Sequence, residues 1–117
     1  MPATLDGLKA EYDEKRQRLY ESRRLRVRTL LEAADWSMAE AARRIGYSDD
    51  NTAGQGYVRN VLGGHATSSP ILGRVEGALS RWARDHAEAL NARAASGDRA
   101  AQDLLDAAES ALQGQAA

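Results

Sequence analysis

Residues 37–64, SMAEAARRIGYSDDNTAGQGYVRNVLGG, contain the signals that begin and end two short helices. Ser37 and Glu40 have the spacing of a capping box, in which one side chain caps the helix start and the other reaches back to it. This spacing predicts a helix over residues 38–45. Gly46 is expected to stop it, because glycine readily adopts the left-handed conformation that ends helices. The two glycines that close the quoted stretch predict the end of a second helix.

The same stretch has small and apolar residues where a helix-turn-helix needs them. Ala42 allows the two helices to cross closely, and Gly46 follows where the chain turns. Ala41 and Ile45 are the flanking core positions of the first helix. The polar residues 48–56 are expected to form a turn or a poorly formed start of the second helix. The buried side of that second helix is predicted to consist of Val58, Val61 and Leu62.

A long helix is predicted before this pair, over residues 5–34, with Thr4 as its N-cap. Residues at steps of three and four form one stripe along it: Leu5, Leu8, Tyr12, Arg16, Leu19, Arg23, Val27 and Leu30. Burying the two arginines in this stripe would be costly without partners, so the two ends of the helix are expected to pack separately. Its middle is expected to project into solvent, meet a second subunit or contact DNA.

Two more helices are predicted after the pair. Ser69 as N-cap and Pro70 at the first helical position open a helix that reaches about residue 95. Asp98 caps a last helix that ends at about residue 113. Alanine and leucine are abundant, whereas isoleucine plus valine total six, which favours helix over sheet. The predicted fold is all-α, with an N-terminal basic helix (1–35), a helix-turn-helix core (36–84) and an acidic C-terminal helical extension (85–117).

Charge is segregated along the chain, although the net charge is only −1. Residues 1–14 carry a net −3, residues 15–28 carry +6 and residues 85–117 carry −4. The basic run is either a solvated helix face or a footprint for an anionic polymer. The chain has no cysteine, and no apolar run approaches the length of a membrane span. We therefore expect a soluble, cytoplasmic protein without disulfides or membrane contact.

Residues 37–48 and 57–64 together resemble the Cro and phage-repressor class of helix-turn-helix DNA-binding proteins. In that class a recognition helix ends in a Leu-x-Gly-type stop, and a further helix covers the core. Residues 70–82 look like the covering helix. They also resemble the N-terminal DNA-binding segment of the phage Mu transposition B subunit, where such a helix closes in a Leu-x-x-Trp pattern. The resemblance spans residues 36–82, and the turn after Gly46 is about six residues longer than in the class.

The resemblance implies double-stranded DNA as the partner, read by the second helix and held by nearby cations. Asparagine and glutamine can pair with adenine, and arginine with guanine. Base reading is therefore expected of the residues Thr52, Gln55, Arg59 and Asn60. Phosphate contacts, which position a protein without reading sequence, are expected of Arg23, Arg24, Arg26, Arg28, Arg43, Arg44, Tyr57 and His65. The alternatives are an ordinary exposed side chain at each position and a plain helix–helix corner for the motif.

Catalysis is not signalled by this sequence. The pattern Gly54-x-Gly56 lacks the third glycine of a dinucleotide loop, and His86 and Glu88 lack the spacing of a helical metal pair. No enzyme activity, cofactor or metal site is expected.

The leading hypothesis is a repressor-like, sequence-specific transcriptional regulator of a phage or mobile element. It is expected to act as a homodimer on two half-sites about 34 Å apart. One alternative is a helical protein-interaction module, such as a phage-encoded inhibitor, that binds a partner through its C-terminal helices. Another is an accessory DNA binder in transposition or packaging.

Overall fold

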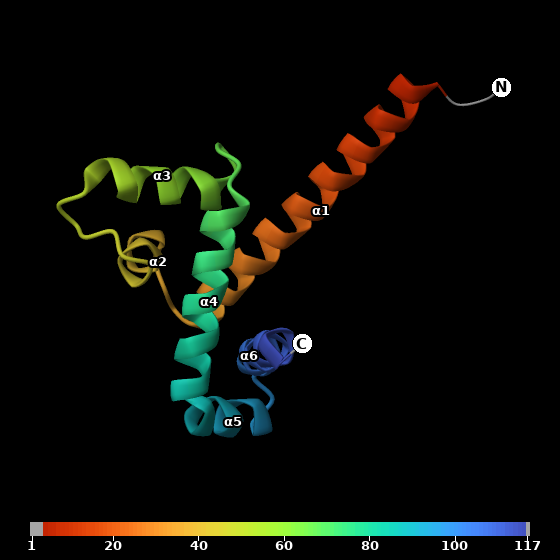
Figure 1. Ribbon diagram of the computed structural model, residues 1–117. Coiled ribbons are helices and arrows are strands. Elements are labelled where there is room, and N and C mark those ends of the chain that lie inside the picture. The colour runs from red at the N-terminus through yellow and green to blue at the C-terminus, as the bar shows by residue number, and fades with distance from the viewer. Residues whose placement is uncertain (1–3, 117) are drawn as a thin grey trace.

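The computed structural model describes residues 4–116, with side chains up to residue 111, and this part of the chain contains helices and no strand (Figure 1). The predicted all-α class is therefore confirmed. The helices are, in order, α1 (Leu5–Ala33), α2 (Met38–Arg44), α3 (Thr52–Gly63), α4 (Ser69–Asp85), α5 (Ala87–Ala95) and α6 (Arg99–Ala116). Across the described residues, none of these helices combines the length and apolarity that crossing a membrane requires.

Helix α4 is the centre of the fold, because it contacts each of the other five helices. The pair α2–α3 packs near its N-terminal half, whereas α5 and α6 fold back beside its C-terminal half (Figure 1). The apolar side chains that α4 buries lie on one stripe, as its helical pattern predicts: Ile71, Leu72, Val75, Ala78, Leu79 and Ala83. One hydrophobic core thus joins the quoted motif to the first and last helices.

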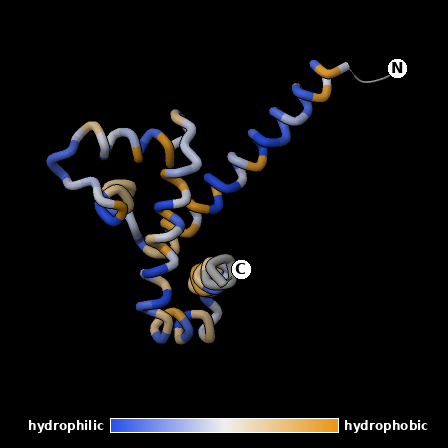
Figure 2. The backbone as a smooth tube through the Cα atoms, in the orientation of Figure 1, coloured by the Kyte–Doolittle hydropathy of each residue, from blue (hydrophilic) through white to orange (hydrophobic). Residues whose placement is uncertain are grey.

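Helix α1 divides into a packed C-terminal half and a projecting N-terminal half (Figure 1). Val27, Leu30 and Leu31 lie in the core, so this end packs as expected. Residues 5–19 are all exposed and extend away from the other helices. Apolar residues recur among the polar ones along this half (Figure 2). The expectation that the N-terminal end also packs was wrong for the single chain, since every residue from 5 to 19 is exposed.

Helix α2 begins and ends close to the predicted positions. The Ser37 hydroxyl accepts a hydrogen bond from the Glu40 backbone N–H at 3.0 Å, which is half of the predicted capping box. The Glu40 carboxylate does not complete the box, because it accepts hydrogen bonds from Arg43 and Arg44 instead. Gly46 adopts a φ of 107° just after the helix, the left-handed conformation expected of a glycine stop.

Helix α3 begins at Thr52, inside the segment 48–56 that was predicted to be a turn or a poorly formed helix start. The Asn51 side chain caps it by accepting a hydrogen bond from the Gly54 N–H at 2.9 Å. Asparagine is among the strongest N-cap residues, so Asn51 was the available signal that the sequence reading missed. The loop before it is therefore shorter than expected, and the second helix is longer.

Gly54 fits a position where a side chain would collide with the loop. A Cβ atom at Gly54 would overlap the Tyr47 ring and lie 2.8 Å from Asn51 Nδ2. The Tyr47 ring is itself held, because the Arg74 guanidinium lies over it at 5.4 Å. Gly56, two residues later in the same helix, has open space where a Cβ would be added. The two glycines are thus a matched pair in which only the first is sterically required.

We expect Gly54→Ala to lower the free energy of unfolding by about 1–3 kcal/mol, because overpacking outweighs the better helix propensity of alanine. Gly56→Ala should instead raise it by up to about 1 kcal/mol, since alanine is the better helix former and nothing obstructs it. Urea unfolding followed by circular dichroism measures both values. If both substitutions instead raise the free energy of unfolding by the same amount, the Tyr47 contact does not constrain α3.

Two helix boundaries after the motif differ from the prediction. The N-cap of α4 is Ser68, whose hydroxyl accepts from the Ile71 N–H at 3.2 Å, so Ser69 is already the first helical residue. The single helix expected to reach about residue 95 is broken at His86, which has a φ of −113° and a ψ of 20°. The His86 ring stacks on Trp82 and its Nδ1 lies 2.8 Å from the Trp82 carbonyl oxygen.

The break at His86 allows α5 to bury Leu90 and to return towards α6. Asp98 then caps α6 as predicted, by accepting from the Ala101 N–H at 3.3 Å. Tertiary packing therefore overrides the continuous helical stripe that the sequence displays between α4 and α5.

Candidate nucleic-acid interface

Helix α3 has one buried and one exposed face. Val58, Val61 and Leu62 are fully buried, which confirms the predicted inner side of this helix. Arg59 and Asn60 are exposed on the other side, and among residues 4–111 no carboxylate lies within ion-pair distance of Arg59. The outer face is therefore free to meet a ligand without breaking an internal contact.

Thr52 lies at the N-terminal end of α3 and is also exposed. Gln55, one turn further, is half-buried and turned towards the loop. Its side-chain amide donates to the Tyr47 carbonyl oxygen at 3.0 Å and lies 3.5 Å from the Asp49 carboxylate. Gln55 thus closes the loop between α2 and α3 and does not share the outer face of Thr52.

Two of the predicted phosphate contacts, Arg43 and Arg44, lie at the end of α2 in a network of ion pairs. Arg43 bonds Glu40 at 2.7 Å and Asp49 at 2.9 Å, whereas Arg44 bonds Glu40 at 2.8 Å and lies over the Trp36 ring. Hydrogen bonds from Arg43 and then from Arg44 lower the pKa of the Glu40 carboxyl, which is therefore ionised at neutral pH. Both guanidinium groups remain partly exposed at the surface.

Tyr57 and His65 flank the outer face of α3 without being enclosed. Tyr57 is exposed on the helix, and His65 is exposed in the turn that follows Gly64. Both side chains are therefore placed where they can reach a polyanion that contacts α3. The structure brings Arg43, Arg44 and Tyr57 to the same helix pair.

Arg24 is buried, with 8% of the residue exposed, which contradicts its predicted role as a phosphate contact. Its Nη1 donates to the Leu62 carbonyl oxygen at 2.9 Å, at the end of α3. Its other nitrogens bond the Glu21 carboxylate, which raises the pKa of Arg24 and lowers that of Glu21. Gly64, at a φ of 87°, accommodates the guanidinium, since a Cβ there would lie 3.2 Å from Arg24 Cζ. Arg24 of α1 is therefore hydrogen-bonded to the C-terminal end of α3.

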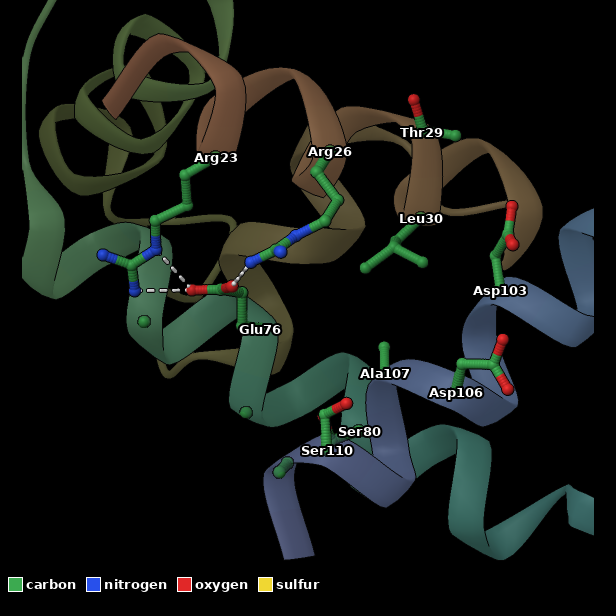
Figure 3. Close-up of a pocket in the computed structure, with 13 residues that line it drawn as sticks. Arg23, Arg26, Thr29, Leu30, Glu76, Ser80, Asp103, Asp106, Ala107 and Ser110 are labelled. Carbon is green, nitrogen blue, oxygen red and sulfur yellow. Dashed lines mark hydrogen bonds and ion pairs between the residues drawn. The ribbon is translucent and has the colours of Figure 1, made fainter. Parts of the chain in front are cut away.

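The other arginines of the basic run point in different directions around α1. Arg23 and Arg26 both bond the Glu76 carboxylate of α4, at 2.8 Å and 3.2 Å, whereas Arg28 is half-buried. These contacts lie at one end of a groove of about 710 Å³ between α1, α4 and α6 (Figure 3). Small residues of α4 and α6 leave this space open: Gly73, Gly77, Ser80, Ala107 and Ser110. The basic run is thus not one continuous surface beside α3.

The described residues contain no cluster of three or more histidines, aspartates or glutamates arranged to hold a metal ion. No protein-family model, curated protein or solved structure matches this chain.

Proposed function

We propose that this protein binds double-stranded DNA in a sequence-specific manner, with α3 in the major groove, as a small repressor-like regulator of a phage or mobile element. The observation that carries the proposal is the division of α3. Its inner face is fully buried, and its outer face presents Arg59 and Asn60 to solvent. Those two side-chain types are suited to reading guanine and adenine edges. The proposal assigns the protein to the cytoplasm, at the nucleoid, with no catalytic role and no cofactor.

Thr52 and the small residues of α3 support a close approach to a groove. Thr52 lies at the N-terminal end, which is the end that contacts base edges in helix-turn-helix proteins. Ala53 is exposed and Gly56 has open space around it, so neither keeps the helix away from DNA. Gln55 contributes indirectly in this scheme, because its hydrogen bond to Tyr47 fixes the loop that leads into α3.

The phosphate contacts in this proposal come from Arg43 and Arg44 at the end of α2, from Tyr57 on α3 and from His65 in the turn after α3. The ion pairs that hold the two arginines lie at the surface, where such pairs contribute about 0–1 kcal/mol. Exchanging a carboxylate partner for a phosphate oxygen therefore costs little. Arg26 and Arg28 are candidates for weaker contacts along α1, whereas Arg24 is excluded by its burial.

The test is selection of bound sequences from random duplexes, followed by affinity measurements at several salt concentrations. We expect one enriched sequence and a linear fall of log affinity with log salt. Arg43→Ala and Arg44→Ala should each reduce that slope by about one and weaken specific and scrambled duplexes equally. Arg24→Ala is unsuitable for testing a phosphate contact, because it removes a buried side chain that bonds the Leu62 carbonyl oxygen. Equal affinity for all duplexes, or no binding at low salt, would exclude the proposal.

A second candidate function is a helical protein-interaction module, and the groove between α1, α4 and α6 favours it. The groove has Asp103 and Asp106 at one end and the Arg23–Glu76 pair at the other (Figure 3). A partner segment with a basic end would match the acidic end of this groove. Absence of DNA binding together with capture of such a partner would select this function.

A further inference from the structure

The groove between α1, α4 and α6 contains a buried hydroxyl group that the fold does not use. Ser80 of α4 is only 5% exposed and lines this groove. The hydroxyls of Thr29 and Ser96 donate to the carbonyl oxygen four residues earlier, but within residues 4–111 Ser80 Oγ has no hydrogen-bond partner. No fully enclosed side-chain oxygen in that part of the chain lacks a partner, so the Ser80 hydroxyl reaches the groove. It is therefore available to bond a ligand there.

The two ends of the groove carry opposite charges (Figure 3). At one end Asp103 and Asp106 are exposed, and within residues 4–111 no cation pairs with either carboxylate. At the other end Arg23 and Arg26 share the single carboxylate of Glu76. Arg26 bonds it through Nη2, which leaves its other N–H groups available to an anion. The groove therefore suits a ligand with a cation at one end and an anion at the other.

The size of the groove and its middle part narrow the choice of ligand further. Its volume of about 710 Å³ lies within the usual range of small-molecule sites, about 300–1,000 Å³. Leu30 of α1 and Ala107 of α6 lie between the charged ends and supply apolar contact (Figure 3). Arg23 and Leu30 are seven residues apart, so about 10 Å of α1 borders the groove. An extended tripeptide also spans about 10 Å and carries an ammonium, amide groups and a carboxylate in that order.

We propose that this groove binds a free peptide of about three residues. Its ammonium group lies at Asp103 and Asp106, its carboxylate at Arg26, and one of its amides bonds the Ser80 hydroxyl. A nucleic acid is a poor occupant, because the two aspartates would repel its phosphates. This inference goes beyond DNA binding, since it concerns a small ligand and leaves α3 free. Peptide binding is measured without DNA, so either proposal can fail while the other holds.

The first test changes the charges of the peptide. The probe is the tripeptide Ala-Leu-Ala, added to the isotope-labelled full chain and followed by NMR chemical shifts. We expect a dissociation constant below about 1 mM. Acetylating the N-terminus or amidating the C-terminus should each weaken binding about 3–5-fold, because each removes one ion pair at a partly exposed site. A peptide blocked at both ends imitates a segment inside a longer protein and should bind weakest.

The second test changes the groove. Ser80→Ala should raise the dissociation constant about 3–10-fold by removing one hydrogen bond to the peptide. Ser69→Ala is its control, since Ser69 is exposed at the start of α4 and does not line the groove. The double variant Asp103→Asn with Asp106→Asn should weaken the free peptide and leave the acetylated peptide unaffected. Asp50→Asn, in the exposed loop before α3, repeats the same chemical change away from the groove and should alter neither affinity.

Four results would overturn the proposal. The wild-type chain could show no shift changes with Ala-Leu-Ala up to about 10 mM. The doubly blocked peptide could bind as well as the free one, which would indicate a segment of a larger partner protein. Ser80→Ala could bind the peptide as tightly as Ser69→Ala does. Acetylation could still weaken binding to the double aspartate variant, which would place the ammonium group elsewhere. Circular dichroism of each variant checks that helix content is retained, so that a change in affinity reports on the groove.

Discussion

Replacing Arg24 by methionine is expected to lower the free energy of unfolding by about 2–4 kcal/mol. Methionine keeps much of the apolar stem but cannot donate to the Leu62 carbonyl oxygen, which Arg24 Nη1 bonds at 2.9 Å in the interior. A buried acceptor left without a donor costs about 1–3 kcal/mol, and the bond lost here involves a charged group. Urea unfolding followed by circular dichroism measures the loss.

The control for this substitution is Arg23→Met, one residue earlier in the same basic run. Arg23 is partly exposed, and its partner Glu76 keeps a second arginine, Arg26, when Arg23 is removed. Its loss should therefore cost less than about 1 kcal/mol, as is usual for surface ion pairs. If both variants unfold at the same urea concentration as the wild type, Arg24 does not fasten α3 to α1.

Arg24 also shows how a residue in a charge run can be misread. The count of seven cations in residues 15–28 suggested one basic surface. However, Arg24 precedes Val27 by three residues and Leu31 by seven, so it lies on the side of the helix that faces the core. Helical spacing therefore offered a signal that Arg24 is buried. Its acceptor, Leu62, is 38 residues away, and no local pattern connects the two.

The parts of the fold that sequence predicted correctly depend on local chemistry. Thr4, Ser37 and Asp98 cap their helices through hydrogen bonds to residues three positions later, and each was predicted from its residue type. Gly46 and Gly64 adopt the left-handed conformation in which glycine ends helices. The buried side of α3 followed from helical periodicity. All of these features are fixed within about one turn of the chain.

The features that sequence did not predict depend on distant contacts. The bend at His86 forms where α5 turns back to bury Leu90 near α6, although the apolar stripe of α4 continues past that point. Gln55 looked like an outward polar residue, but its amide reaches back to Tyr47 across the loop. The path of that loop could not be derived from its polar, glycine-rich composition. For the candidate interface, residue type alone made Gln55 and Asn60 equal candidates for base reading. Only the folded structure shows that Asn60 is exposed, whereas the Gln55 amide is bonded to the loop.

Substitution of the two exposed side chains of α3 is the sharpest test of DNA reading. We expect Arg59→Ala and Asn60→Ala each to weaken binding to the selected duplex by about 1–3 kcal/mol and to relax the preference at one base position. Binding to scrambled duplexes should change little for Asn60→Ala, because the amide carries no charge. Both side chains are exposed, so neither substitution should alter stability appreciably.

Matched controls separate reading from charge and from helix effects. Arg81 is exposed on α4 and Asn91 on α5, so Arg81→Ala and Asn91→Ala repeat the same chemical changes away from α3. Arg81→Ala removes a positive charge and should lower affinity for specific and scrambled duplexes alike, and only slightly. The difference between Arg59→Ala and Arg81→Ala therefore isolates hydrogen bonding to base edges from general attraction. If the two arginine variants lose the same affinity on every duplex, α3 does not read sequence, and its exposed face serves only to hold the backbone of DNA.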